Sequence, residues 1–433
     1  MAEKAAIHNL GCKVNAYEVE AMRQMLEEAG YAIVPFAPGA DVYVINTCTV
    51  TNIADRKSRQ MLHRAKKMNP DAVVVAVGCY AQIRGEELRK DPAIDLVIGT
   101  NRKSELVSLI RQFRKTGERG TESSDLIKDR TYEQLQIRKS EEHTRAFIKV
   151  QDGCDSFCTY CIIPYARGRV RSRQKEEVLR EAERLVQNGV KEIVLTGIHI
   201  CSYGKDLKDG TDLLSLICAV HEIENLSRLR LGSLEPSFIT ENVVKTMASL
   251  DRLCPHFHLS LQSGCDSTLQ RMGRRYTTEE FAKKAEMLRK AFPDSALTTD
   301  LIAGFPGETE EEFEETFRFV DRMSFFETHV FPYSRREGTR AAEMPGQKTE
   351  QEKKGRVGRL LELNSVHQEA YLKHFLLKPV EVLFEETVKV DGKPYQSGHG
   401  RQYQRVLLAK DGDLSGEIVT VEPKYVKDGC LFA

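Results

Sequence analysis

Residues 153–161 read Gly153-Cys154-Asp155-Ser156-Phe157-Cys158-Thr159-Tyr160-Cys161, with three cysteines at C-x3-C-x2-C spacing. This spacing allows one short loop to hold three thiolates around a single inorganic cluster. Three thiolates suit three irons of a 4Fe–4S cube, because each iron takes one thiolate, and the fourth iron stays open to a small molecule. A zinc site would need a fourth Cys or His at short spacing, and His199 is far away in the sequence. The spacing therefore favours a cluster over zinc or three unrelated thiols.

The bulk composition excludes little beyond a membrane protein. The 433 residues are enough for roughly two to four domains. Lys+Arg and Asp+Glu both total 64, so the net charge gives no sign of a nucleic-acid partner, although a local basic surface could exist. No run of about 18 apolar residues appears, so we expect no transmembrane span. Met1-Ala2-Glu3-Lys4 leads directly into a strand-like run, which is unlike a secretory signal. Its 11 cysteines are odd in number, which fits a reducing cytoplasm better than a disulfide framework.

Residues 1–115 alternate buried strand-like runs with amphipathic helical stretches, a pattern typical of a doubly wound parallel sheet. The strand-like runs are 5–10, 31–34, 42–46, 72–77 and 96–98. The helical stretches are 16–29, 54–68, 85–89 and 103–114.

Three cysteines of this first domain, Cys12, Cys48 and Cys79, each follow a strand-like run. The carboxyl ends of parallel strands meet at one edge of a sheet, where ligands collect, so we expect these thiols to converge. Gly11 and Gly78 would let the backbone approach a ligand closely. The alternative is that the cysteines are small buried residues, but three equivalent positions favour a second three-thiolate 4Fe–4S site.

The rest of the chain divides into a linker, a barrel, a helix and a β-rich tail. Residues 116–143 are polar and predict a linker; 144–345 contain six β/α units, which predict a partial parallel barrel; 346–377 predict a long helix. Residues 378–433 read as short alternating strands, which predict a small antiparallel barrel. Residues at the ends of the barrel strands are candidates for binding a small molecule: Thr196, Gly197, Ser233, Glu235, Gln262, Ser263, Gly264, Asp300 and Tyr333.

Basic residues concentrate in three places, each with an open alternative. Four arginines between 167 and 173 (Arg167, Arg169, Arg171 and Arg173) could bind a carboxylate or a phosphate, or belong to a solvated loop. A stripe at Arg56, Arg59, His63 and Lys67 could be functional or an ordinary solvated helix face. The loop 397–405 offers arginines and a tyrosine for RNA contact.

The cysteine loop, with Tyr160 before its last cysteine, resembles the signature of radical S-adenosylmethionine (SAM) enzymes. This resemblance implies that the open iron chelates SAM and that an electron from the cluster cleaves SAM to a 5′-deoxyadenosyl radical. The segment 299–309 resembles the barrel segment that lies along the adenine of SAM in these enzymes, and the tail resembles the TRAM domain, an RNA-binding module. We therefore expect the SAM-binding residues to be Tyr160, Gly197, Ser233, Glu235, Gln262 and Asp300.

The order of the three parts resembles the methylthiotransferase family over essentially the whole chain. In that family one SAM supplies a methyl group to sulfur at an N-terminal cluster, and a second SAM yields the radical that removes hydrogen from carbon. The resemblance implies two 4Fe–4S clusters, tRNA as a partner, an electron donor such as flavodoxin or ferredoxin, and a sulfur donor. The metal-binding and catalytic cysteines would be Cys12, Cys48, Cys79, Cys154, Cys158 and Cys161.

The stretch 10–18 resembles the branch that adds a methylthio group at C2 of N(6)-threonylcarbamoyladenosine, at tRNA position 37. Cys201 stands where this branch would have Gly, and we interpret it as a tolerated small residue. Three alternatives stay open: an isopentenyladenosine tRNA substrate, a ribosomal-protein substrate, and a non-enzymatic Fe–S protein that binds RNA. A pocket for the threonylcarbamoyl carboxylate needs a cation, and the candidates are Arg167, Arg169, Arg171, Arg173, Arg335 and Arg336.

Overall fold

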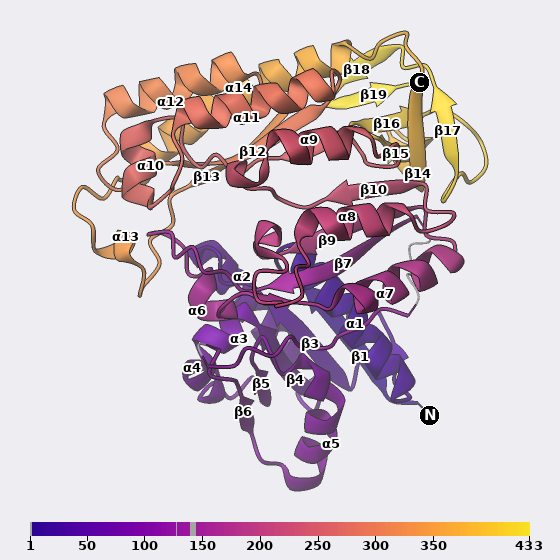
Figure 1. The fold of residues 1–433 in the computed structure, drawn as a ribbon. Helices are drawn as coiled ribbons and strands as arrows, with labels where there is room; N and C mark the ends of the chain where they lie inside the picture. The colour runs from indigo at the N-terminus through magenta and orange to yellow at the C-terminus, as the bar shows by residue number, and fades with distance from the viewer. Residues whose placement is uncertain (1, 127, 139–143) are drawn as a thin grey trace.

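The computed structural model describes residues 2–126, 128–138 and 144–433. Figure 1 shows an N-terminal sheet with its helices at the bottom, the central strands and helices above it, and a small sheet near the C-terminus at the top right. Among the helices of these ranges, none is long and apolar enough to cross a membrane. The fold is α/β with an antiparallel β tail, which confirms the predicted fold class.

Six parallel strands form the N-terminal sheet, in the order β2-β1-β3-β4-β5-β6. The strands are β1 (Lys4–Asn9), β2 (Ala32–Ile33), β3 (Val42–Thr47), β4 (Val73–Gly78), β5 (Leu96–Ile98) and β6 (Gly120–Glu122). The helices are α1 (Lys13–Glu28), α2 (Asn52–Met68), α3 (Cys79–Ile83), α4 (Gly85–Arg89) and α5 (Leu106–Thr116). Along β3, Tyr43 and Ile45 pack on the α2 side, while Val42 and Val44 pack on the side of α1 and α5. Helices cover both faces, so the sheet is doubly wound as predicted.

The segment 116–143 is more structured, in its described part, than the linker that the sequence predicts. β6 pairs in parallel with β5 and extends the sheet beyond residue 115. Tyr132 and Leu135 are buried. The Tyr132 hydroxyl donates to the Lys149 carbonyl in the next strand (2.7 Å), and the Leu135 carbonyl accepts from the Tyr17 hydroxyl of α1 (2.6 Å). Isolated apolar residues in a polar stretch give no periodic signal, which is why the sequence conceals this packing.

Six further parallel strands form an open barrel in the central part. They are β7 (Arg145–Asp152), β9 (Glu192–Gly197), β10 (Arg228–Leu231), β11 (His256–His258), β12 (Ala296–Ala303) and β13 (Glu327–Pro332). Backbone bridges from 229 to 253 and from 234 to 259 join the β7–β9–β10 sheet to the β11–β12–β13 sheet. The short β8 (Arg171–Ser172) pairs antiparallel with β7. The barrel agrees with the six predicted β/α units.

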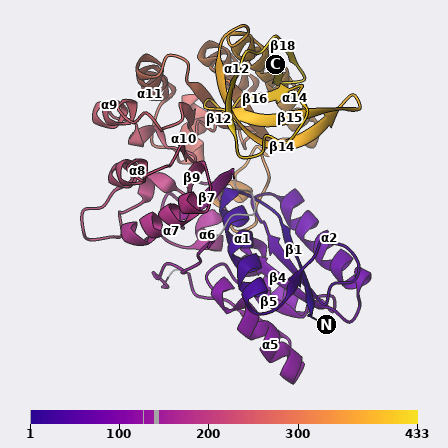
Figure 2. The ribbon, with the colours of Figure 1, turned by 90° about the vertical axis from the view of Figure 1, so that its right-hand side faces the viewer.

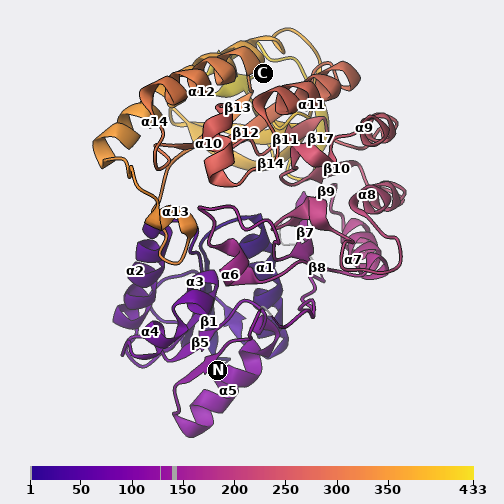
Figure 3. The ribbon, with the colours of Figure 1, turned by 60° about the vertical axis from the view of Figure 1, so that its left-hand side comes forward.

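Helices cover the outer side of these strands, with α7, α8, α9 and α11 in a row in Figure 3. The helices of the central part are α6 (Ile163–Arg167), α7 (Lys175–Gln187), α8 (Leu213–His221), α9 (Glu241–Ala248), α10 (Asp266–Met272), α11 (Thr278–Ala291), α12 (Glu310–Met323) and α13 (Arg340–Glu343). The sequence pattern does not predict α6, α10 or α13, all of which are short.

A long helix, α14 (Glu350–Lys373), leads to the tail, which Figure 2 shows beside the barrel. The tail strands are β14 (Val380–Val390), β15 (Lys393–Gly400), β16 (Arg405–Leu408), β17 (Ile418–Val421), β18 (Tyr425–Lys427) and β19 (Cys430–Phe432). Their order is β17-β14-β15-β16-β19-β18, and all pairs are antiparallel except β16 with β19.

Buried arginines attach the tail to the barrel. Arg228 contacts the Glu381 carboxylate (2.8 Å), and Arg230 donates to the Arg401 carbonyl (3.0 Å). The Tyr403 ring packs against the Arg230 guanidinium, 4.8 Å from the ring centroid. The loop 397–405 was expected to present its tyrosine to RNA, and this prediction is wrong for Tyr403, because the ring is occupied at the barrel interface.

A buried charge network joins the N-terminal sheet to the barrel. Glu18 of α1 contacts Arg167 (2.6 Å), Lys149 (2.9 Å) and Lys103 (3.4 Å), and all four side chains are at most 1% exposed. Burial alone would raise the pKa of Glu18, but the three cations hold it well below its usual range. The carboxylate therefore stays charged and compensates cations from three separate segments.

We expect Glu18→Gln to lower the free energy of unfolding by about 3 kcal/mol, because it leaves Asp152 and Glu133 to compensate three buried cations. The shift is measurable from thermal or urea unfolding midpoints. Glu28→Gln is the control: it removes an exposed pair with Arg138 and should cost less than about 1 kcal/mol. Equal effects of the two substitutions would contradict the role given to the network.

Candidate active site

The structure gathers Cys12, Cys48 and Cys79 at the carboxyl edge of the N-terminal sheet. They follow β1, β3 and β4, which are neighbours in the sheet. A Cβ placed on Gly11, whose φ is +118°, would lie 3.2 Å from the Cys48 Cβ, so the loop that carries Cys12 runs directly against Cys48. Gly78 has φ +97°, and a Cβ there would meet the backbone of β3. The two glycines permit the close approach that the sequence predicts.

The second cysteine loop leaves the end of β7. Gly153 has φ +72°, and a side chain there would collide with the Arg169 carbonyl oxygen. The Cys154 N–H donates to the Gly168 carbonyl (3.0 Å), and the Cys161 N–H donates to the Cys158 carbonyl (3.0 Å). These bonds fold the loop so that its three thiols stand near one another.

In each triad, burial raises the pKa of two of the three thiols: Cys48 and Cys79 in one, Cys154 and Cys161 in the other. Burial and the neighbouring thiols Cys79 and Cys12 raise the pKa of Cys48 to about 12. Burial, with Cys158 and Cys154, likewise raises the pKa of Cys161 to about 12. Such thiols stay protonated at neutral pH, so binding a metal must displace the protons.

The spacing of the thiols suits a cluster better than a single ion. Across the described residues, one group of three or more His, Cys, Asp or Glu has its ligand atoms within 4.8 Å of one another, namely His258, Asp300 and His329. Neither cysteine triad meets this limit. Thiolates that bind separate irons of a cube need not stand as close as the ligands of one ion, so both triads fit 4Fe–4S cubes.

A cavity of about 400 Å³ opens beside the second cysteine loop. Arg274 lines it, with one guanidinium nitrogen 2.5 Å from the Glu235 carboxylate and the other 3.4 Å from the Cys158 sulfur. His199 stands on the other side of Glu235, at 3.8 Å. A carboxylate and a guanidinium next to a thiol can pair with the amino and carboxylate groups of an amino acid. No motif in the sequence marks Arg274 as a functional residue.

The predicted SAM residues do not all face this cavity. Glu235 lines it. Tyr160 packs edge-on against Phe305 (ring centroids 6.4 Å apart), and Ser233 is exposed just after β10. A Cβ on Gly197 would lie 2.9 Å from Gln151, so this glycine serves packing between β7 and β9.

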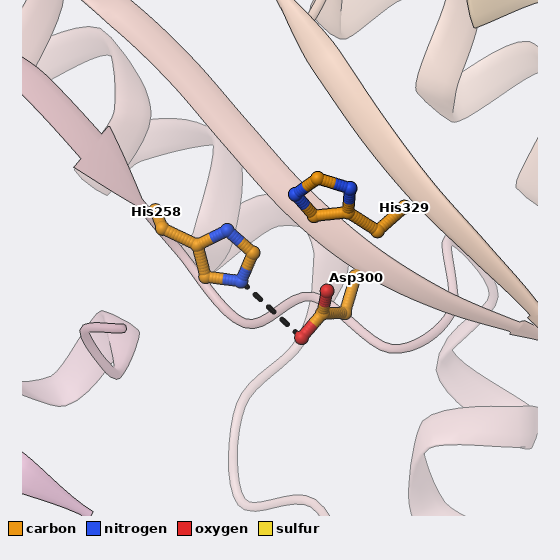
Figure 4. Close-up of side chains that lie close together, drawn as sticks. All are labelled: His258, Asp300 and His329. Carbon is orange, nitrogen blue, oxygen red and sulfur yellow. Dashed lines mark ion pairs between the residues drawn. The ribbon is translucent and has the colours of Figure 1, made fainter. Parts of the chain in front are cut away.

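Gln262, four residues past the end of β11, lies beside Asp300 of β12. Gln262 adopts φ +72°, which is rare for a residue with a side chain, and its N–H donates to the Asp300 carbonyl (2.8 Å). Such strain tends to persist where the surrounding structure uses it. Figure 4 shows the Asp300 carboxylate beside His258 and His329.

The arginine run after the cysteine loop is largely buried, which corrects its predicted role. Arg167, Arg171 and Arg173 are fully buried. Arg173 pairs with Glu181, and Arg171 lies 3.7 Å from the Asp152 carboxylate. These three are therefore unable to bind RNA phosphate from solution. The acids that pair with them lie outside the arginine run, so the run alone does not reveal the pairing.

The remaining predicted arginines and the α2 stripe are placed as follows. Arg169 lies over the Phe157 ring (4.6 Å) and stays partly exposed, while Arg336 is buried against Asp55 (2.8 Å). Arg335 donates to the Ala342 carbonyl (2.7 Å). The α2 stripe is exposed, and Arg59 donates to the Tyr80 hydroxyl (2.6 Å). Cys201 accepts from the Glu235 N–H (3.2 Å), which agrees with a packing role.

Arg167 connects the two cysteine triads. Its Nε lies 3.2 Å from the Cys79 sulfur. The next residue, Gly168, accepts the hydrogen bond from the Cys154 N–H (3.0 Å). Thiols from two domains therefore stand on either side of one short segment, and the two triads face a common region between the N-terminal sheet and the barrel.

Comparison with known proteins agrees with this division. Residues 148–320 match the "Radical SAM superfamily" and residues 4–99 match the "Uncharacterized protein family UPF0004". The chain is 44% identical over 425 residues, 98% of this chain and 94% of the relative, to "Threonylcarbamoyladenosine tRNA methylthiotransferase MtaB" of Bacillus subtilis (strain 168). It is 37% identical, over 95% of this chain and 93% of the relative, to "tRNA-2-methylthio-N(6)-dimethylallyladenosine synthase" of Moorella thermoacetica.

Among solved structures, the radical S-adenosylmethionine methyltransferase TsrM from Kitasatospora setae has a TM-score of 0.58 at 16% identity, over 76% of this chain and 73% of that one. This likeness shows that the two proteins share a fold. The full-length similarity to curated relatives, together with the two cysteine triads, establishes the family. The chain belongs to the radical SAM methylthiotransferase family.

Proposed function

We propose that this enzyme adds a methylthio group at C2 of N(6)-threonylcarbamoyladenosine, at position 37 of tRNA. The observation that carries the proposal is the convergence of two thiol triads on Arg167. Relatives at 44% and 40% identity are named for threonylcarbamoyladenosine, and relatives at 37% and 35% are named for dimethylallyladenosine. The dimethylallyl (isopentenyl) substrate is therefore the second candidate.

The cofactors of the family are SAM and two 4Fe–4S clusters, and the residues present fit them. We assign one cluster to Cys154, Cys158 and Cys161, and the other to Cys12, Cys48 and Cys79. Bound there, these groups supply the electron that cleaves SAM and the site where sulfur is methylated and presented. A carboxylate or imidazole is not needed in either set, because three thiols leave one iron of each cube open.

The residues around the 400 Å³ cavity would position SAM. Glu235 would accept from its amino group and Arg274 would donate to its carboxylate, as charge-assisted hydrogen bonds. Gly197 would affect SAM binding indirectly, because it packs against Gln151. The side-chain amide of Gln151 donates to the Gly153 carbonyl (2.6 Å) and so stabilises the cysteine loop. Tyr160, Ser233 and Gln262 stay proposed SAM contacts, whereas we propose that Asp300, which the sequence also predicts as a SAM contact, contacts the substrate base.

Arg167 would tune the N-terminal site. Burial raises the pKa of Cys79, while the guanidinium of Arg167 acts in the opposite direction and favours the thiolate. Its side chain also donates to the Asn15 amide oxygen (2.7 Å), which lies 3.7 Å from the Cys12 sulfur. One fixed cation thus stabilises negative charge that would be costly in this buried region.

We propose tRNA as the macromolecular partner and the cytoplasm as the compartment. The tail would contact RNA through surface other than Tyr403, such as the exposed Lys389 and Lys393 beside the β14–β15 turn. A flavodoxin or ferredoxin would deliver electrons, and a separate sulfur donor would restore the N-terminal site after each turnover.

The test of substrate choice is a turnover comparison. The anaerobically reconstituted enzyme should methylthiolate tRNA that bears threonylcarbamoyladenosine at least ~100-fold more efficiently than tRNA that bears isopentenyladenosine, because a site built for polar groups rejects an apolar tail. Mass spectrometry of the nucleosides measures both products. Comparable turnover would refute the branch assignment and leave the family membership intact.

The two triads should be separable by mutation. The reconstituted enzyme should hold about eight irons. Replacing Cys154, Cys158 and Cys161 with Ala should halve the iron and abolish 5′-deoxyadenosine formation. Replacing Cys12, Cys48 and Cys79 should also halve the iron but preserve SAM cleavage while abolishing the methylthio product. Full iron content in either triple variant would rule out that ligand assignment.

Gly153→Ala should remove roughly half of the iron and all SAM cleavage, because the new Cβ would displace the cysteine loop from Arg169. Gly210→Ala is the matched control: its φ is +81° but nothing lies within 4 Å of the new Cβ. It should cost only about 1–2 kcal/mol of backbone strain and retain the iron. Iron and 5′-deoxyadenosine are assayed together, and normal values for Gly153→Ala would show that the loop tolerates the displacement.

A further inference from the structure

We propose that His258, Asp300 and His329 of the barrel, together with Lys13 of the N-terminal domain, hold the threonylcarbamoyl side chain of the substrate base and so determine specificity. This inference rests on the proposed function and assigns the polar part of its substrate to a place in the structure. Figure 4 shows the three barrel residues, which we call the polar cluster.

The polar cluster comes from three neighbouring strands. Asp300 on β12 pairs in register with His329 on β13. His258 on β11 brings its Nε2 to 3.3 Å from the Asp300 carboxylate, and the two imidazole rings stack with centroids 5.7 Å apart. The other ring nitrogen of His258 lies 3.0 Å from the Thr298 hydroxyl, which fixes the orientation of the ring. The cluster is therefore pre-organised.

The three side chains range from nearly buried to exposed, as expected for residues that line a binding site from its base to its edge. The side chains of His258, Asp300 and His329 are 11%, 31% and 43% exposed, so His258 forms a floor and His329 a rim. The Nε2 of His258 is buried and makes no hydrogen bond of good geometry to the described residues, although the Asp300 carboxylate lies 3.3 Å away. A buried polar atom left in this state is costly unless a ligand completes it.

Lys13 adds a cation from the opposite domain. It follows Cys12 directly and is exposed at the start of α1. The surrounding protein atoms, then Arg230 and Arg145, lower the pKa of Lys13, while the carboxylates of Glu192 and Asp300 act in the opposite direction. Glu192 is already paired with Arg230 (2.8 Å) and Arg145 (2.6 Å). Lys13 makes no ion pair within 4 Å in the part of the chain that the structure describes, so its ammonium group is free to pair with an anion.

The chemistry of threonylcarbamoyladenosine matches these groups. Its carboxylate can accept from Lys13 and from an imidazole N–H, and its hydroxyl can donate to Asp300. An isopentenyl tail offers none of these partners and would leave the buried groups unpaired, which is a strong basis for rejection. Because Lys13 adjoins Cys12, a base held here would lie beside the thiols that we assign to the sulfur-presenting cluster.

Two histidines and one carboxylate are also a common ligand set for a divalent metal. The surroundings argue against that occupant, because Lys13 and Arg230 are cations near the cluster. Burial lowers the pKa of the neighbouring His256, and the positive charges of Arg230 and Lys13 lower it further. Positive charge repels a metal ion and attracts a carboxylate. The metal is therefore the competing outcome of the test.

The test uses the reconstituted holoenzyme and three anticodon stem–loop RNAs. These carry threonylcarbamoyladenosine, its carboxamide analogue without the negative charge, or isopentenyladenosine. The variants are Lys13→Gln and His329→Phe. Their matched controls are Lys283→Gln, which removes an exposed lysine paired with Glu279, and His374→Phe, which removes an exposed histidine paired with Asp294. Fluorescence anisotropy without SAM measures binding, and single-turnover kinetics separate KM from kcat.

Lys13→Gln should weaken binding of the threonylcarbamoyl RNA at least 10-fold and that of the carboxamide RNA less than 3-fold, with the effect in KM more than in kcat. His329→Phe should lower the preference over the isopentenyl RNA at least 10-fold. The control variants should match the unmodified enzyme in both. Iron content and the unfolding midpoint check that each variant is folded and loaded.

Equal losses on the carboxylate and carboxamide RNAs, or no loss, would overturn the inference. So would one equivalent of a divalent metal beyond the cluster iron that disappears in His329→Phe. If the unmodified enzyme preferred the isopentenyl RNA, the proposed function would fail. If it preferred the threonylcarbamoyl RNA and both variants kept that preference, only the assignment of the polar cluster would fail.

Discussion

The fully buried guanidinium of Arg167 is the constraint on which the two-domain arrangement depends. It contacts the Glu18 carboxylate and the Cys79 sulfur of the N-terminal domain, while its own helix continues from the second cysteine loop. A buried cation is stable only when its partners are in place, so the two domains cannot separate or slide without exposing an uncompensated charge. This interaction fixes the distance between the thiol triads, and sulfur transfer to a carbon that has lost hydrogen requires such a fixed distance.

The parallel strands are the second feature that determines where the two thiol triads lie. The cysteines of both triads and several candidates for SAM binding follow strands of a parallel sheet, where side chains from distant parts of the sequence meet. Asp300 and His329 lie within β12 and β13, and Arg274 follows α10. Glycines with positive φ, such as Gly11 and Gly153, then let the backbone turn sharply enough to bring thiols inward. Both thiol triads therefore lie where parallel strands end, one at the N-terminal sheet and one at the barrel.

The sequence predicts this architecture well because strand and helix periods, and the cysteine spacing, are local signals. The doubly wound sheet, the six-strand barrel and the convergence of Cys12, Cys48 and Cys79 all rest on them. The sequence does not predict the role of a residue when that role depends on a partner outside the local sequence. Arg171 reads as a phosphate ligand until Asp152 is seen 3.7 Å away, and Tyr403 reads as an RNA-stacking ring until Arg230 covers it. Arg274 and His329 carry no motif, so only the fold reveals what they face.

The tail belongs to the active site in a physical sense, although none of its residues touches either triad in the described structure. Tyr403 packs on Arg230, Arg230 pairs with Glu192, and Glu192 also pairs with Arg145, which contacts Glu385 of the tail (2.8 Å). Lys13 and His256 both face Arg230. Removing the tail would take Glu385 from Arg145 and the Tyr403 ring from Arg230, and would leave Glu192 to compensate both buried arginines beside the polar cluster. An RNA role for the tail is therefore better examined through its exposed lysines, because a deletion would disturb RNA binding and the substrate site together.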